Sequence, residues 1–233
     1  MTKPIMSVAI MQLIERGLLA LDDPIEMYIP EVKDLRVALN LDLGVDSPTQ
    51  KVNQSMTILD LLTHTSGLSH GLGDSNLDKQ IFKALYDETL NYRSHESLED
   101  RVFTLLSFPL VAQPGTQWYY SAGADILALI LQRVTKQSIP TYLKINIFDP
   151  LDMNDTGYNL DELQSRRVMK LHSRNERNTV KRHEQQVPTS GNTIYGGTHG
   201  LFSTATDYAQ FCLMILHNGT WNGSQILKAD TVK

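Results

Sequence analysis

The sequence predicts a mainly helical α+β domain that extends over residues 1–233. Three observations lead to this fold class. Several segments carry apolar residues at helical spacing, the stretches that could form strands are few and short, and neither an internal repeat nor a domain linker interrupts the chain. The composition is that of an ordinary globular protein, with 41% hydrophobic and 20% charged residues, and 233 residues are enough to bury a sizeable core.

The first segment predicts a buried helix. Apolar residues over 5–14 occupy nearly every face at helical spacing, which is typical of a core helix rather than a surface helix. Pro4 suits the first turn of such a helix, and Gly17 is a natural stop. Lys3 therefore stands at the mouth of a buried helix, which is an unusual place for a charged side chain.

A polar loop and a short capped helix are expected next. Residues 33–55 are irregular, so we expect a loop there with at most one short strand. A helix over about 57–63 should follow, because Ser55 or Thr57 can cap it and Asp60 is favourably placed in its first turn.

Helical spacing returns in the rest of the chain, over about 77–91, 95–106, 121–136 and 139–147. Weak periodicity over 157–195 leaves room for one or two strands around 168–171. A last strong helix should begin at Thr206 or Asp207 and end at Leu216, with Cys212 packed as a small core residue.

Composition argues against several classes of partner. The net charge of -5 argues against nucleic acid and anionic membranes, because both need a basic surface. The basic residues between 166 and 182 are interleaved with polar ones and predict a solvated loop face. No apolar run reaches the ~18–20 residues needed to cross a bilayer, so we expect no membrane span in this chain. One cysteine excludes an internal disulfide bond.

Three familiar kinds of site find weak support. The pattern G-x-S-x-G occurs at 67–71, but the expected helix before Ser69 and the loop after it reverse the strand-then-helix context of a hydrolase nucleophile. The seven histidines, His64 and His70 among them, lack metal-site spacing. The glycine-rich stretch 196–200 does not match a phosphate-binding loop, and a turn explains it as well. We expect neither a metal nor another cofactor.

A lysine–tyrosine pair offers a different chemistry. A serine one helical turn before a lysine places hydroxyl and amino groups on one helix face, and a neutral lysine can take the hydroxyl proton. Lys3 has the right place for this, although the serine would stand immediately before Met1. Tyr119 and Tyr120 lie in a turn suited to sharing the proton transfer. On residue chemistry alone, a surface lysine and a packed tyrosine are the default explanation of these positions.

Six short sequence motifs, here called boxes, follow one another along the chain. The most specific is 61–68 (LLTHTSGL), and the others are 1–5, 21–31, 114–121, 150–156 and 200–208. In this order they resemble the serine β-lactamase-like hydrolases, the family that unites class C β-lactamases, DD-peptidases and family VIII carboxylesterases. The resemblance covers nearly the whole chain and implies the β-lactamase/transpeptidase-like fold.

The resemblance also implies roles for two residues. Lys3 would be the general base of an S-x-x-K nucleophile motif, and Tyr120 would be the tyrosine that helps to move protons. The family's tyrosine motif usually ends in asparagine, whereas Ala122 stands at that position here. Alanine cannot hydrogen-bond the amide of a β-lactam. The implied substrate is therefore a small-molecule ester, with a β-lactam-like substrate as the alternative.

Two parts of the family's site are missing from the sequence, namely the serine of the S-x-x-K motif and the later K-T-G or H-T-G motif. We therefore expect a single partial domain over 1–233, truncated at both ends: mostly the helical part of the fold, with little of its antiparallel sheet. The chain itself should be inactive, and its parent should be a short-chain carboxylesterase that works through an acyl-serine intermediate. A β-lactamase, a D-alanyl-D-alanine peptidase and a non-catalytic binding relative are the alternatives.

Overall fold

The computed structural model describes residues 1–86, 95–175, 178–182 and 187–233. Helices dominate it, as expected. The α-helices are α1 (Thr2–Glu15), α2 (Ile58–Thr63), α3 (Asn76–Leu85), α4 (Leu98–Leu106), α5 (Gly123–Thr135), α6 (Ile139–Leu143), α7 (Glu162–Arg166), α8 (Ala205–Leu216) and α9 (Ala229–Val232). Shorter helical turns are η1 (Ile25–Met27), η2 (Pro30–Asp34), η3 (Leu41–Asp46), η5 (Lys144–Phe148) and η6 (Asp149–Leu151).

The strands of the described residues form three separate two-stranded antiparallel ribbons. They pair β1 (Arg36–Ala38) with β2 (Thr49–Lys51), β3 (His172–Arg174) with β4 (Val180–Arg182), and β5 (Thr220–Trp221) with β6 (Ser224–Gln225). Each strand has only two or three residues, so the ribbons decorate the helical body and do not form a central sheet. The expected α+β class, with little sheet, is confirmed.

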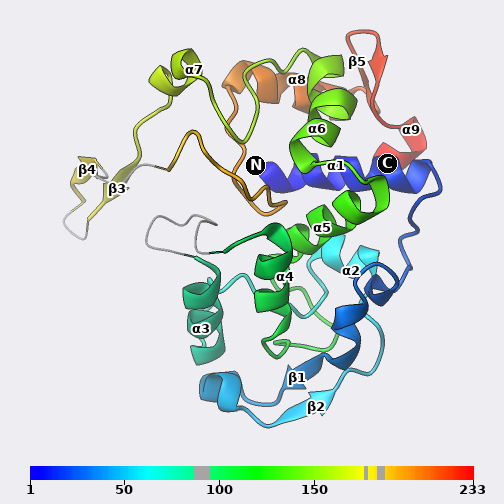
Figure 1. Ribbon diagram of the computed structural model, residues 1–233, viewed down its shortest axis with the longest axis vertical. Coiled ribbons are helices and arrows are strands. Elements are labelled where there is room, and N and C mark those ends of the chain that lie inside the picture. The colour runs from blue at the N-terminus through cyan, green and yellow to red at the C-terminus, as the bar shows by residue number, and fades with distance from the viewer. Residues whose placement is uncertain (87–94, 176–177, 183–186) are drawn as a thin grey trace.

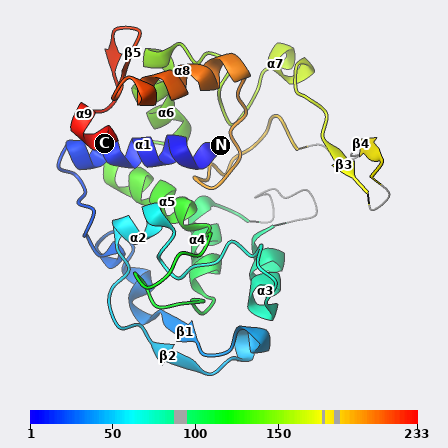
Figure 2. The ribbon, with the colours of Figure 1, turned by 180° about the vertical axis from the view of Figure 1, so that it is seen from behind.

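Helix α1 runs across the middle of the molecule (Figure 1). The elements α2 to α4, β1 and β2 lie on one side of it, and α6 to α9 lie on the other. The view from behind shows the same division (Figure 2). The N-terminal end of α1 therefore opens where loops from both sides of the molecule meet.

Helices α1 and α5 form the centre of the hydrophobic core. They pack directly on each other, and α5 also contacts α2, α4 and α6. Every residue over 123–131 of α5 is buried, and α1 buries Ile5, Met6, Ala9, Ile10 and Leu13 almost completely. Apolar side chains on nearly every face predict such a core helix, because only a helix surrounded by protein removes all of them from water.

The prediction of a capped helix over about 57–63 is confirmed. Thr57 caps α2, its hydroxyl accepts from the amide of Asp60, and the Asp60 carboxylate accepts from the amide of Thr57. His64 ends the helix in the left-handed conformation, with φ 59°. This sharp turn directs the chain into the loop formed by residues 64–71, which leads to the N-terminal end of α1.

Several expected boundaries were wrong. Residues 36–51 include two strands rather than at most one. The one or two strands expected around 168–171 are present as β3 and β4, but β3 begins at His172, one residue beyond that stretch. Helix α8 begins at Ala205, because Thr204 rather than Thr206 or Asp207 caps it. Of the helix expected over 77–91, residues 76–85 form α3, and residues 87–94 lie outside the described part of the chain.

The expectation for Cys212 was also wrong. Its side chain is exposed, because only the face of α8 that carries Phe211 and Met214 packs on the core. The apolar run is long enough to cover the whole helix, so sequence alone does not indicate which face is buried. In the described part of the chain, no helix has both the length and the apolar character needed to cross a bilayer.

Candidate active site

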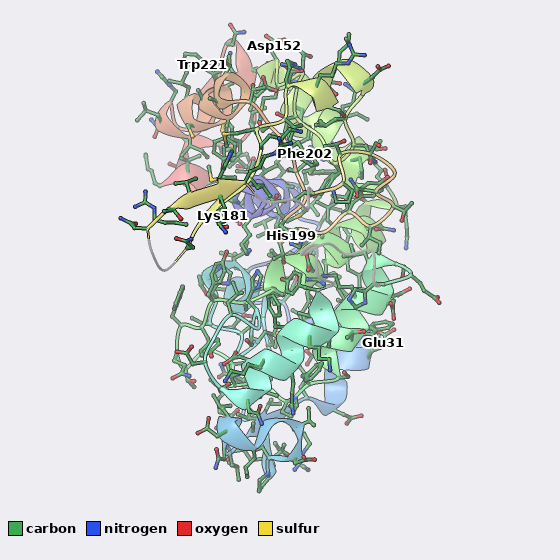
Figure 3. All side chains as sticks on the ribbon, turned by 90° about the vertical axis from the view of Figure 1, so that its left-hand side faces the viewer. Glu31, Asp152, Lys181, His199, Phe202 and Trp221 are labelled. Atoms are coloured by element: carbon green, nitrogen blue, oxygen red, sulfur yellow. The ribbon has the colours of Figure 1, made fainter. Side chains whose placement is uncertain are left out.

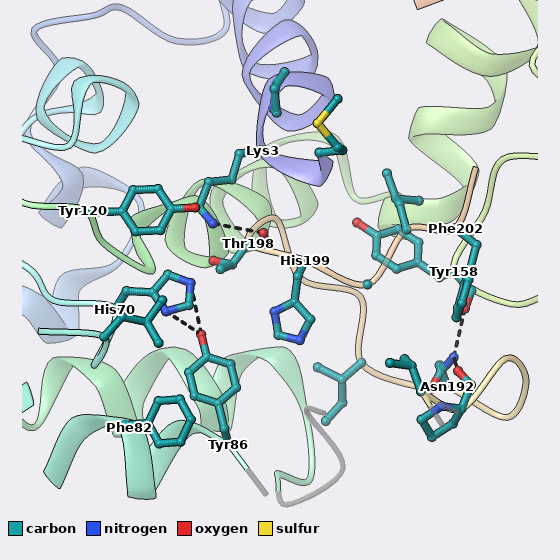
Figure 4. A pocket seen from close by; sticks show the side chains of 18 residues that line it. Lys3, His70, Phe82, Tyr86, Tyr120, Tyr158, Asn192, Thr198, His199 and Phe202 are labelled. Carbon is teal, nitrogen blue, oxygen red and sulfur yellow. Dashed lines mark hydrogen bonds between the residues drawn. The ribbon is translucent and has the colours of Figure 1, made fainter. Parts of the chain in front are cut away.

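The N-terminal end of α1 borders a cavity of about 830 Å³. The residues that line it come from α1, the 70–86 segment, Tyr120 and the loops between 158 and 202 (Figure 4). His199 and Phe202 lie at the level where the two sides of the molecule meet (Figure 3). Among the described lining residues, Lys3 is the one lysine or arginine and there is no aspartate or glutamate, so the cavity is mainly apolar and aromatic.

Lys3 projects from the first turn of α1 into this cavity. Its Nζ donates a hydrogen bond of 3.1 Å to the carbonyl oxygen of Thr198 and lies 4.6 Å from the ring centroid of Tyr120. The structure therefore brings together the two residues that the sequence singled out, although 117 positions separate them in the chain. A cation at this distance from a phenol ring face is attracted to its π electrons.

Tyr120 sits on the loop that precedes α5. This loop is tied to the end of α2, because the amide of Tyr119 donates to the carbonyl of His64 over 2.8 Å and the amide of Gly115 donates to that of Thr65. The Tyr120 side chain keeps 40% of its surface exposed, so it is accessible from the cavity. Tyr119, the other tyrosine considered, instead turns its hydroxyl to Asp78 over 2.8 Å and stays outside the cavity lining.

A buried ion pair supports the carbonyl group that Lys3 contacts. Asp125 on α5 accepts a 2.8 Å bond from Arg101 Nε, and its other oxygen accepts a 2.8 Å bond from the amide of Thr198. Burial works to raise the pKa of Asp125, but the charge of Arg101 and the hydrogen bonds outweigh it and hold that pKa below its usual range. The loop lies so close that a Cβ at Gly197 would stand 2.0 Å from the carbonyl oxygen of Ala124.

The G-x-S-x-G pattern is a structural turn. Ser69 is only 2% exposed, its hydroxyl donates to Asp78, and its oxygen accepts from the amide of Gly71 over 2.8 Å. Gly71 has φ +81°, and a Cβ there would lie 2.6 Å from the amide nitrogen of Phe82. The prediction that Ser69 is not a nucleophile is supported by this burial, and the turn aims His70 into the cavity (Figure 4).

Asp78 joins this turn to the loop that carries Tyr120. Its fully buried carboxylate accepts hydrogen bonds from the hydroxyls of Ser69, Ser75 and Tyr119. Burial works to raise the pKa of Asp78, whereas these three hydroxyls stabilise the charged form and lower the pKa overall. One ionised side chain thus fixes two of the segments that form the cavity wall.

We expect Asp78→Asn to destabilise the protein by about 1.5–3 kcal/mol, the usual worth of hydrogen bonds to a buried charge. The folded pKa is lowered, so the ionised carboxylate contributes stability above its unfolded pKa of about 3.9 and loses it as the pH falls through the folded value. Urea unfolding at pH 7 and near pH 3 measures both effects, and the difference between variant and wild type should shrink at the lower pH.

The exposed neighbour Asp74 provides the matched control for this test. Asp74→Asn should change the free energy of unfolding by no more than about 0.5 kcal/mol at either pH. Equal effects of the two substitutions would contradict a special role for the Asp78 carboxylate.

Two histidines near the cavity, His64 and His70, have a lowered pKa. Burial, with a contribution from the charge of Lys3, lowers the pKa of His70 to about 4. The same two causes, in the same order, lower the pKa of His64. Burial raises the pKa of Tyr86 and Tyr158, so both phenols stay protonated. Within the described residues, no group of three His, Cys, Asp or Glu side chains is arranged to hold a metal ion.

Sequence reasoning identified Lys3 and Tyr120 but missed the residues that hold them in place. Thr198 contributes a backbone carbonyl, which no residue pattern reveals. Asp125 could have been noticed, because it is an acidic residue inside a segment that is otherwise apolar on nearly every face. Its partner Arg101 lies on another helix, so the pairing required the fold.

The full chain, residues 1–233, matches the family model described as Beta-lactamase. Among curated proteins, Protein Rv1367c of Mycobacterium tuberculosis (strain ATCC 25618 / H37Rv) is 31% identical over 235 residues, which is 100% of this chain and 56% of that protein. Lovastatin esterase of Penicillium rubens is 30% identical over 226 residues, covering 93% of this chain and 54% of the esterase. The chain thus spans about half the length of these relatives.

Solved structures agree on the fold. Simvastatin synthase (LovD) from Aspergillus terreus, in its LovD6 mutant form, matches with a TM-score of 0.80 and 24% identity, covering 99% of this chain and 53% of the synthase. EstCE1, described as a hydrolase with promiscuous acyltransferase activity, matches with a TM-score of 0.76 and 20% identity, covering 99% of this chain and 60% of EstCE1.

Proposed function

The chain belongs to the beta-lactamase family, which includes esterases and acyltransferases, and from this membership we propose that its full-length protein is a carboxylesterase that works through an acyl-serine intermediate. The observation that carries the proposal is the meeting of Lys3 and Tyr120 at the N-terminal end of a buried helix, beside an apolar cavity. The relatives named as esterases, a lovastatin esterase and Esterase EstB of Burkholderia gladioli, support the ester as substrate.

The proposed nucleophile is a serine three positions before Lys3 in the full-length protein. At that spacing its hydroxyl lies on the same helix face as the lysine amino group, one turn earlier. Lys3, in its neutral form, takes the hydroxyl proton while the serine oxygen bonds to the ester carbonyl carbon. The proton then passes through Tyr120 to the leaving alcohol as its bond to the carbonyl carbon breaks. A water molecule later releases the acid from the acyl-serine.

The surroundings of Lys3 suit this role. The 3.1 Å bond to the Thr198 carbonyl directs the amino group into the cavity, and the buried Arg101–Asp125 pair holds that carbonyl in place. A base must be fixed within hydrogen-bonding reach of the proton that it abstracts, so this support favours catalysis over a solvated surface lysine.

Two features favour an ester over a β-lactam. Ala122 occupies the position at which an asparagine would hydrogen-bond the amide of a β-lactam, and an alanine side chain has no polar atom for this purpose. The described cavity lining is apolar and aromatic apart from Lys3 and a few polar side chains, which suits an uncharged ester.

Turnover of paired substrates by the purified full-length gene product tests the proposal. We expect p-nitrophenyl butyrate to be hydrolysed and nitrocefin to be turned over much more slowly, if at all. The 233-residue chain alone is the matched control and should release no p-nitrophenol above background. Faster turnover of nitrocefin would favour the β-lactamase alternative. Acylation by neither compound would favour a non-catalytic binding relative.

A further inference from the structure

We propose that His70 is a positioning residue for Tyr120, whose phenol ring it holds in place beside Lys3 by ring stacking. This inference rests on the proposed function, in which the Tyr120 hydroxyl passes protons, and adds to it a side chain that does not itself touch the reacting atoms. It also explains the G-x-S-x-G pattern, since Ser69 and Gly71 shape the turn that presents His70.

Three rings form one parallel stack along the cavity wall. The His70 ring lies 5.3 Å from the Tyr120 ring, centroid to centroid, with an angle of 5° between the planes. It lies 5.5 Å from the Tyr86 ring at 9°. Figure 4 shows His70 between the two tyrosines, with Lys3 beside Tyr120. Planes this close to parallel, at these separations, are offset stacks, an arrangement that aromatic rings favour.

His70 is itself held firmly. The hydroxyl of Tyr86 lies 3.0 Å from Nδ1 and 3.3 Å from Nε2 of His70. On the backbone side, the turn is closed by the bond from the Gly71 amide to Ser69, and Ser69 is bonded to the buried Asp78. A ring fixed at both its edge and its backbone can restrain a neighbour that is 40% exposed, as Tyr120 is.

The charge state of His70 is compatible with this role. The charges that act on it are those of Lys3 on α1, Asp125 on α5 and His199 in the loop after 196, and its ring contacts are Tyr86 and Tyr120. Burial and the charge of Lys3 keep its pKa near 4, so above about pH 5 the ring is neutral. A neutral imidazole stacks on Tyr120 without repelling the lysine that lies over the same phenol.

His64 also touches Tyr120 but acts differently. Its ring centroid is 4.9 Å from that of Tyr120 at a tilt of 46°, so the two rings do not stack in parallel. Its Nδ1 lies 3.2 Å from the amide nitrogen of Ser121, which fixes the backbone of the loop. His70 is therefore the side chain whose geometry bears on the orientation of the phenol ring itself.

A double-mutant cycle in the full-length gene product tests the inference. We expect His70→Ala to lower kcat for p-nitrophenyl butyrate by about 10- to 100-fold, the cost of a misplaced catalytic group, while KM changes less than about threefold. In the Tyr120→Phe background the same His70→Ala change should have less than a twofold further effect, because the hydroxyl that His70 positions is already gone. His70→Phe, which keeps the stack, should retain kcat within about threefold.

The outcomes separate this inference from the proposed function. An inactive wild type, or a fully active Tyr120→Phe variant, would overturn the proposed function itself. If the wild type is active and Tyr120→Phe is impaired, two results would overturn the role of His70 alone. One is a double variant whose loss of kcat equals the product of the two single losses. The other is an equal loss of kcat in His70→Phe and His70→Ala. If His70→Ala fails to fold, His70→Gln replaces it, since glutamine also removes the ring. His172→Ala, at an exposed site on β3, is the control and should leave kcat unchanged.

Discussion

Replacing Lys3 by alanine in the full-length protein should lower kcat/KM for p-nitrophenyl butyrate by about 10²- to 10⁴-fold, the usual contribution of a positioned general base. The amino group of Lys3 is aimed into the cavity by its 3.1 Å bond to Thr198 and lies over the ring of Tyr120. Alanine removes the only lysine or arginine among the described cavity-lining residues. Steady-state kinetics with circular dichroism on the same samples would separate lost chemistry from lost structure.

Two further variants sharpen this prediction. Lys3→Arg keeps a positive charge but cannot become neutral, so it should be nearly as inactive as Lys3→Ala if the residue is a base. Lys79→Ala, at an exposed site on α3, should leave kcat/KM unchanged. Full activity of Lys3→Arg would show that a positive charge is what the site requires, and would contradict the role of Lys3 as the base.

Asp125→Asn should destabilise the protein by about 3–5 kcal/mol. The substitution keeps the shape of the side chain but removes the negative charge that pairs with the guanidinium of Arg101, which is only 1% exposed. It also weakens the acceptor for the Thr198 amide, so the carbonyl that holds Lys3 should lose its fixed position. Chemical denaturation at pH 7 would measure the first effect, and ester turnover by the folded fraction would measure the second.

The stability lost in Asp125→Asn should depend on pH, in the direction set by the lowered pKa of Asp125. Because the pKa of Asp125 is lowered in the folded protein, its ionised form contributes stability above the unfolded pKa, near 3.9. That contribution is lost as the pH falls through the lowered folded value. Wild type and Asp125→Asn should therefore differ most near neutral pH and converge in acid.

An exposed ion pair offers the control for Asp125. Glu99 pairs with Arg133 on the surface, and Glu99→Gln should cost less than about 1 kcal/mol. Replacing both buried partners with apolar residues, as in Arg101→Met with Asp125→Leu, should restore much of the stability lost by Asp125→Asn, because no uncompensated charge remains. Equal losses in the single and double variants would contradict the ion-pair explanation.

The helices of the core could be predicted because the spacing of their apolar residues reflects which faces are buried. The segment 5–14 is apolar on nearly every face, and only a helix inside the protein satisfies such a pattern. The capped helix at Thr57 could be predicted because capping is local chemistry between residues three positions apart. The strands were misplaced because ribbons of two or three residues, mostly exposed, carry little alternation of apolar and polar side chains.

The candidate site, too, has residues that the sequence could predict and residues that it could not. Lys3 and Tyr120 could be found because they stand in recognisable boxes of the sequence. The support for Lys3 could not, since it passes from Arg101 through Asp125 to a backbone carbonyl, across three separate segments. The parallel stack of His70 between two tyrosines likewise depends on distances that exist only in the folded chain.

Covalent labelling of the active full-length protein tests the central claim most directly. After reaction with a fluorophosphonate, which acylating serine hydrolases attack as they attack esters, peptide mass spectrometry locates the modified residue. We predict one adduct per molecule, on a serine three positions before Lys3, and its loss in the Lys3→Ala variant. An adduct on Ser69 or on any other residue, or labelling that persists undiminished in Lys3→Ala, would contradict the assignment of this site.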